Sequence, residues 1–308
     1  MQPYDVLVAG EINPDLVFSD PLLSVGFGQQ ETLVEDLALT IGSSSAIFAC
    51  GAARLGLKVG FVGVVGDDLF GHFMLDAMRK REIDVTPVLV DGASKTGVSV
   101  ILSRGADRAI LTYPGAISAL SAGQVASELL SRARHLHVAS YFLQTRLQAG
   151  LPDLFRRAHS LGLTTSFDTN WDPSGQWAGL DDLLPLADVL LLNENEALAI
   201  AQVDTVDAAL ERLGQKSQTV AVKRGARGGM ARRGSGTASA SSLPVNVVDT
   251  VGAGDTFDAG FLYGYLNNWP LEKSLHLACV CGSLSTLAAG GTESQPTLAQ
   301  AVERMAPA

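Results

Sequence analysis

The residues best suited to chemistry lie in one short stretch, Gly252-Ala253-Gly254-Asp255, which precedes a run with helical spacing. One interpretation is structural, because a carboxylate in the first turn of a helix bonds free N–H groups and offsets the helix dipole. The small residues in front of it indicate more, since they let an anion approach the backbone N–H groups closely. An acid beside a phosphate site suits phosphoryl transfer, in which a base accepts the proton of the attacking hydroxyl.

Short apolar runs alternate with helical patterns through most of the chain. Strands are predicted over 5–10, 58–66, 135–140, 163–168, 188–192 and 219–223, and helices over 44–56, 67–82 and 275–291, the last one ending at Gly290-Gly291. The last third of the chain is expected to be mainly helical. This alternation predicts an α/β fold with a central, mostly parallel sheet flanked by helices, similar to a Rossmann fold.

Two segments depart from this alternation. Residues 12–41 hold extended pieces and turns without a helical pattern, and residues 96–113 read as a hairpin around Arg104-Gly105-Ala106-Asp107. Together they predict a small β-sheet at the ligand edge of the main sheet, which would act as a lid. The chain is therefore expected to form one domain, 1–308, with its lid at about 12–41 and 96–113. A homodimer through this lid is a further hypothesis, and the sequence leaves the oligomeric state open.

Composition narrows the classes of function. The 22 basic and 32 acidic residues give a net charge of −10, which argues against nucleic acid and an anionic membrane as partners. We find no apolar run long enough to span a bilayer and no signal-peptide pattern at the N-terminus. The cysteines, Cys50, Cys279 and Cys281, form no CxxC pair, which is typical of reduced, packed thiols. These features predict a cytoplasmic protein.

The stretch at 249–257, Asp-Thr-Val-Gly-Ala-Gly-Asp-Thr-Phe, resembles the C-terminal signature of the ribokinase-like (PfkB) carbohydrate kinase family. Residues 41–71 resemble its N-terminal signature, and 10–18, 167–177, 193–198 and 222–229 resemble other landmarks of the family. The resemblance implies a ribokinase-like fold. It also implies transfer of the γ-phosphate of ATP, with Mg2+, to a primary hydroxyl of a free sugar or sugar acid.

The resemblance assigns roles to the residues of the signature. Asp255 matches the general base of the family, and the backbone N–H groups of Gly252, Ala253 and Gly254 match its anion hole. Asp249 resembles a ligand of a monovalent cation, and activation by K+ is common in the family. The loop near Gly290 would supply further oxygen ligands.

Other matching positions concern the sugar. Asp15, Gly42 and Ser43 resemble substrate-binding residues of the family, although the family usually has a second glycine where this chain has Ser43. The family often has Asn where this chain has Ile47, and an isoleucine cannot reach a sugar hydroxyl with a hydrogen bond. This departure leaves the identity of the sugar open.

The nucleotide side is implied by a third group of residues. Asn193 and Glu196 match a motif that orders the magnesium and phosphate water network, with Glu196 holding Mg2+ through water. The same two residues also fit a helix capping box, and both interpretations can hold. Lys223 and Gly225 resemble the nucleotide contact, although Lys223 could instead be a solvated surface charge. Two further residues at a strand end could line the site or make a turn: Asp168 and Asn170.

Three alternatives to a sugar kinase are open. A nucleoside kinase of the same family would need an aromatic-lined pocket, for which the candidates are Phe27, Tyr113, Tyr141 and Phe142. A non-catalytic protein that binds sugar or nucleotide is disfavoured by the intact Gly-Ala-Gly-Asp stretch. A dinucleotide-binding oxidoreductase is disfavoured because no GxGxxG motif follows the first predicted strand.

Overall fold

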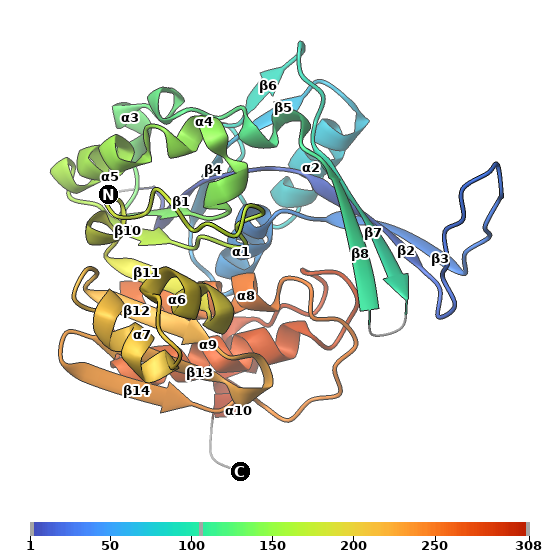
Figure 1. Ribbon diagram of the computed structural model, residues 1–308. Helices are drawn as coiled ribbons and strands as arrows, with labels where there is room; N and C mark the ends of the chain where they lie inside the picture. Colours follow the sequence, from blue (N-terminus) through green and yellow to red (C-terminus); the bar gives the residue numbers. More distant parts are fainter. Residues whose placement is uncertain (1–2, 105–106, 306–308) are drawn as a thin grey trace.

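The computed structural model describes residues 3–104 and 107–305. The strands of its main sheet are β1 (Val6–Ala9), β4 (Val59–Val62), β9 (His135–Val138), β10 (Thr164–Phe167), β11 (Val189–Asn193), β12 (Thr219–Lys223), β13 (Gly229–Arg233) and β14 (Gly236–Ala240). They lie in the order β14-β13-β12-β11-β10-β9-β1-β4 (Figure 1). The strands from β12 to β4 run parallel, and β13 and β14 add an antiparallel hairpin. The predicted α/β fold with a mostly parallel central sheet is confirmed.

Helices cover both faces of this sheet. One face carries α1 (Ser44–Arg54), α2 (Leu69–Arg79), α8 (Ala253–Leu266), α9 (Leu271–Ser285) and α10 (Leu298–Met305). The other carries α3 (Ser127–Leu130), α4 (Thr145–Gln148), α5 (Leu151–Ser160), α6 (Glu194–Ala201) and α7 (Val206–Leu213). Alternate strand residues join the two apolar clusters, so Val6 and Val8 pack on one face and Leu7 on the other. Burial on both faces explains why the strands read as continuous apolar runs.

A smaller sheet extends from the main body (Figure 1). It has the order β3-β2-β7-β8, with β2 (Pro14–Ser19), β3 (Asp36–Ile41), β7 (Val98–Arg104) and β8 (Asp107–Tyr113). The predicted hairpin over 96–113 is confirmed, because β7 and β8 pair in antiparallel register from Val98↔Tyr113 onward. The middle of its turn, 105–106, lies outside the described residues.

Three predictions about elements are corrected. Residues 58–66 form two strands, because the chain leaves the main sheet after Val62. Gly63 lies between the two strands, and a Cβ on it would meet the Gly10 carbonyl at 2.6 Å. The second of them, β5 (Val64–Gly66), pairs with β6 (Leu89–Asp91) in a sheet of its own. Helix α9 ends at Ser285 rather than Gly290-Gly291, since the Thr286 N–H caps its last carbonyls. The hairpin β13–β14 shows that the last third is less helical than expected.

The carboxyl ends of the parallel strands meet at one edge of the main sheet. Asp168 follows β10, Asn193 ends β11 and Lys223 ends β12. The first turn of α8 lies at the same edge, so the sheet brings polar side chains to the mouth of this helix. Among the described residues, we find no helix long and apolar enough to cross a membrane.

Candidate active site

The first turn of α8 is built around glycine. Gly252 caps the helix with a left-handed backbone, at φ 70°. A Cβ at this position would lie 2.8 Å from both Gly291 Cα and Ile47 Cγ2, so no larger residue fits without movement. The first N–H groups of a helix have no partner within it. The turn therefore places N–H donors next to Asp255, which lies in the same turn, and one of them, the Ala253 N–H, donates to the Thr250 carbonyl at 3.3 Å.

Asp255 is buried, with 8% of its surface exposed. The pKa of its carboxyl is raised to about 8, mainly by burial and also by the charges of Asp168 and Glu11, and this value includes the lowering by Lys223 and the Ser44 hydroxyl. A carboxyl with this pKa can take up a proton near neutral pH. That property suits a general base.

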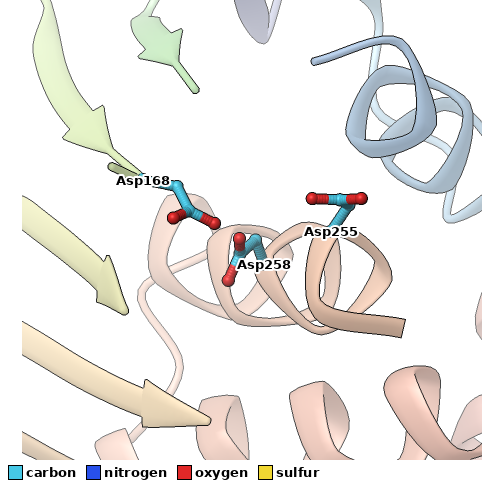
Figure 2. Close-up of side chains that lie close together, drawn as sticks. All are labelled: Asp168, Asp255 and Asp258. Carbon is cyan, nitrogen blue, oxygen red and sulfur yellow. The ribbon is translucent and has the colours of Figure 1, made fainter. Parts of the chain in front are cut away.

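Asp255 lies close to two other carboxyl groups and one ammonium group. Oxygens of Asp168, Asp255 and Asp258 lie within 4.8 Å of one another. Figure 2 shows Asp168 at the end of its strand, facing the helix that carries Asp255 and Asp258. The Lys223 Nζ donates to Asp168 Oδ2 at 2.6 Å and to Asp258 Oδ2 at 2.9 Å. These carboxylates raise the pKa of Lys223, so the lysine is a permanent cation at this site.

The interpretation of Lys223 as a solvated surface charge is wrong, because only 11% of its side chain is exposed. Its stem lies 3.6 Å from the position of a Cβ built on Gly254, directly beside the predicted anion hole. Gly225, two residues further on, has open space around it and a left-handed backbone at φ 55°.

Asn193 and Glu196 form the predicted capping box at the start of α6. Glu196 Oε2 accepts the Asn193 N–H at 2.8 Å, and Asn193 Oδ1 accepts the Glu196 N–H at 3.0 Å. Burial raises the pKa of Glu196 to about 7, and the charge of Asp168 adds to this effect. The structural interpretation of the pair is confirmed, and their role toward Mg2+ stays a prediction.

Asp249 joins two loops. Its Oδ1 accepts the Val251 N–H at 2.9 Å and its Oδ2 accepts the Gly290 N–H at 3.0 Å. The family resemblance predicted that Asp249 and the loop near Gly290 lie together, and the hydrogen bond from the Gly290 N–H shows that they do. Arg108 of β8 approaches Asp249 Oδ1 to 3.7 Å, which links the small sheet to the main body.

The predicted sugar-binding residues lie where the small sheet meets α1. Asp15 is 7% exposed, and burial raises the pKa of its carboxyl to about 7. A Cβ on Gly42 would collide with this carboxylate, so the glycine lets the two segments meet. Ser43 has φ 68°, which explains why glycine is usual there, and its Oγ accepts the Ala46 N–H at 3.1 Å to cap α1.

Ile47 packs against the first turn of α8. It is 3% exposed, and its side chain faces Gly252 and Gly291 closely enough to exclude a Cβ from either. Its carbonyl accepts a hydrogen bond from Gln295 Nε2 at 2.9 Å. Ile47 thus packs beneath the anion-hole turn.

Sequence reasoning missed two buried acids. Glu11 accepts hydrogen bonds from Ser45 N–H at 3.2 Å, Ser45 Oγ at 2.5 Å and Ser140 Oγ at 2.9 Å. Asn170 continues this network, since it accepts the Ser140 N–H at 2.7 Å. Asp258 was also missed. Its signal was present in the sequence, as an acid three residues after Asp255 in an otherwise apolar helical run.

Only two of the four aromatic candidates for a nucleoside pocket lie together: the Tyr141 and Phe142 ring centroids are 5.0 Å apart, and Phe142 also contacts Trp177 at 5.6 Å. Phe27 is 96% exposed and Tyr113 is half exposed. Tyr141 is buried in the core, where its ring centroid lies 5.4 Å from that of Phe167 and its hydroxyl donates to the Gly179 carbonyl at 2.9 Å. Phe27 and Tyr113 therefore do not join the other two candidates, and the nucleoside alternative stays a prediction.

The sequence matches the profile of the pfkB family carbohydrate kinases over residues 4–298, nearly the whole chain. The chain belongs to this family. It is therefore a carbohydrate kinase, a phosphotransferase, as the signature around Asp255 predicted.

Relatives and solved structures agree with this assignment. The kinase is 26% identical to the 5-dehydro-2-deoxygluconokinase of Geobacillus thermodenitrificans, over 97% of this chain and 92% of the relative. It is 32% identical to the fructokinase of Klebsiella pneumoniae, over 83% of this chain and 88% of the relative. The ribokinase of Arabidopsis thaliana, solved with ribose and ATP, is similar with a TM-score of 0.84, 21% identity and complete coverage of both chains. The ribokinase-like fold is confirmed.

Proposed function

We propose that the kinase transfers the γ-phosphate of ATP to a primary hydroxyl of a free sugar or sugar acid. The observation that carries the proposal is the position of Asp255, a buried carboxyl with a pKa near 8 in the glycine-built first turn of α8. Phosphoryl transfer needs a proton acceptor and preorganised donors at one point, and this turn offers both.

In this mechanism, Asp255 accepts the proton of the sugar hydroxyl as that oxygen attacks phosphorus. The N–H groups of Gly252, Ala253 and Gly254 donate to the phosphate oxygens, on which charge increases in the transition state. The ammonium of Lys223 lies beside the same turn and favours an anion there. Asp15, Gly42 and Ser43 line the sugar side, where a carboxylate can accept from neighbouring hydroxyls.

The donor set fits ATP and Mg2+. Carboxylate oxygens are the ligands that Mg2+ prefers, and Glu196 offers a buried carboxylate whose raised pKa would fall beside a cation. Asn193 and Glu196 would hold the ion through water, and Lys223 and Gly225 would contact the nucleotide. Mg2+, when bound, neutralises charge on the phosphates. A ribokinase-like protein of E. coli was solved in complex with both ligands, at a TM-score of 0.89.

The charge of the sugar side favours a substrate without a phosphate. This side holds three carboxyl groups, those of Asp15, Asp249 and Asp255, which become negatively charged as the pH rises, and Arg108 is the cation beside Asp249. A doubly charged sugar phosphate would be repelled, whereas a neutral sugar, or a sugar acid paired with one arginine, would not.

Four further features belong to the proposal. K+ would bind at Asp249, whose two oxygens are fixed between loops. The small sheet would act as the lid of one domain. A homodimer through this sheet is supported by its exposed apolar side chains, among them Leu37, Ile110 and Leu111. A cytoplasmic location is supported by the three free, buried cysteines.

The test is ADP release with ATP, Mg2+ and K+ across ketoses, aldoses, sugar acids and nucleosides. We expect turnover on one sugar or sugar acid, and its loss in Asp255→Asn. Replacing K+ with Na+ at equal ionic strength tests the cation. Turnover on nucleosides alone would move the substrate to the nucleoside alternative. Equal background in both proteins on every compound would overturn the proposed function.

A further inference from the structure

The edge of the main sheet opposite Asp255 carries a concave depression. A depression of about 450 Å3 is lined by Arg134, Thr164, Gln218, Arg233, Tyr265 and Asn268. Most of these residues lie at the starts of parallel strands or at the C-terminal end of α8. Asp255 is in the first turn of α8, ten residues before Tyr265, so a rise of about 1.5 Å per residue puts roughly 15 Å along the helix between the sites.

The charge of this depression differs from that of the chain. The described residues that line it include two arginines and no acid, in a protein with a net charge of −10. Arg134 is already engaged, because its Nη1 lies 2.9 Å from Asp5 Oδ1 and its Nη2 donates to the Leu266 carbonyl at 2.8 Å. It fixes the rim and neutralises the carbonyl end of α8.

Arg233 is different. Its Nε and Nη2 are buried, and neither has a hydrogen-bond partner among residues 3–104 and 107–305. The guanidinium lies over the Tyr265 ring, 5.2 Å from the centroid. Stacking on an aromatic face leaves the in-plane N–H groups free to donate. Buried donors without partners cost free energy, which an acceptor-rich ligand recovers.

One acid acts on this depression from outside its lining, and its carboxylate is already engaged. Asp188 acts on Tyr265 through its charge, yet its carboxylate already accepts the Thr165 N–H at 2.8 Å and lies 3.1 Å from His159 Nε2. The remaining positive charge is therefore that of Arg233.

We propose that this depression binds a small oxyanion, a phosphate or carboxylate group, held by the planar N–H fork of Arg233. Such groups match the guanidinium in geometry and charge. Gln218 and Tyr265 offer further donors around the same space, whereas the Thr164 hydroxyl is already paired with His135 Nδ1 at 2.7 Å. The proposed phosphoryl transfer uses none of these residues, so the anion site stands or falls independently of it.

The test is calorimetric titration of the full chain with inorganic phosphate and, separately, with acetate, against chloride at equal ionic strength. We expect saturable binding in the parent. The affinity should fall roughly tenfold or more in Arg233→Gln, because this variant loses charge-assisted hydrogen bonds to the anion. Arg232→Gln is the matched control, because Arg232 is the neighbour on β13 and does not line the depression. This control should bind like the parent. The two arms show which oxyanion is preferred.

Equal affinity in Arg233→Gln and the parent, or no saturable binding of either anion in the parent, would overturn the site. Arg233→Lys keeps the charge without the fork, and serves if the glutamine variant fails to fold. We expect it to bind more weakly than the parent. Crystals soaked in selenate give an independent measurement. Anomalous density within hydrogen-bond distance of Arg233 supports the proposal, and density only at the mouth of α8 contradicts it.

Discussion

Lys223 joins two buried carboxylates that come from distant parts of the chain, Asp168 at 2.6 Å and Asp258 at 2.9 Å. Neither acid is more than 2% exposed at its side chain. Two acids this close repel each other, and burial penalises their charges. The lysine therefore makes this arrangement stable beneath the anion hole.

Replacing Lys223 with methionine should strongly destabilise the protein, because it leaves buried carboxylates without a counter-charge. We expect a loss of about 3–5 kcal/mol in the free energy of unfolding at pH 8, measured by urea denaturation. The loss should shrink toward pH 5, where protons can neutralise the acids. Lys216→Met is the control, since its pair with Asp181 is exposed to solvent and should contribute little to stability. Equal losses in both variants would contradict this role of Lys223.

The local sequence pattern was sufficient to predict those parts of the site that consist of one continuous segment. The Gly-Ala-Gly-Asp stretch predicted the helix mouth, and Asn193 with Glu196 predicted the capping box, because both depend on residues within one turn. The parallel strands were predictable for a similar reason, since burial on both faces leaves an apolar run in the sequence.

Features that depend on distant segments were not predictable from local pattern. Glu11 gains its role from Ser45 and Ser140, which reach it only after folding. A solvated surface position stayed open for Lys223 as an alternative, because its two acidic partners lie 55 and 35 positions away in the sequence. The hairpin β13–β14 was missed because β13 carries two arginines and β14 only small residues, and the pairing of β13 with β12 and of β14 with β13 reveals them as sheet.

Asp255→Asn should remove most of the turnover, with kcat reduced about 100- to 10,000-fold and substrate affinity little changed. In the parent, kcat/KM should rise with pH up to about 8 and then level off, because the base must be ionised and its pKa is about 8. The residual activity of the variant should lack this pH dependence. A parent profile that stays flat from pH 6 to 9 would exclude Asp255 as the titrating base.

The same substitution should stabilise the protein at high pH. The folded state raises the pKa of Asp255 from 3.8 to about 8, so between these values the folded state holds a proton that the unfolded state has released. Stability contributed by this group therefore falls as pH rises through that window. The advantage of Asp255→Asn should grow from pH 4 to pH 8 and reach at least about 1 kcal/mol, measured by urea denaturation. An advantage that is constant with pH would contradict the shift.

Glu11→Gln should move the pH profile of kcat/KM toward lower pH. The charge of Glu11 raises the pKa of Asp255, and glutamine removes that charge at nearly constant volume. We expect a shift of roughly half a unit or more in the acidic limb. Glu128→Gln, an exposed site, should leave the limb unchanged. A fall in kcat without any shift of the limb would reduce Glu11 to a packing role.

Gly252→Ala should cost both stability and turnover, for two separable reasons. The left-handed backbone at φ 70° disfavours alanine by about 1–2 kcal/mol, and the new Cβ would meet Gly291 Cα and Ile47 at 2.8 Å. Gly234→Ala isolates the first cost, because Gly234 has φ 58° and open space around it. We therefore expect Gly252→Ala to lose more free energy of unfolding than Gly234→Ala. Only Gly252→Ala should lower kcat, by about tenfold or more, because a shifted turn would misdirect the N–H donors. Equal kcat in the two variants would show that the donors at Gly252 do not contact the transferred phosphate.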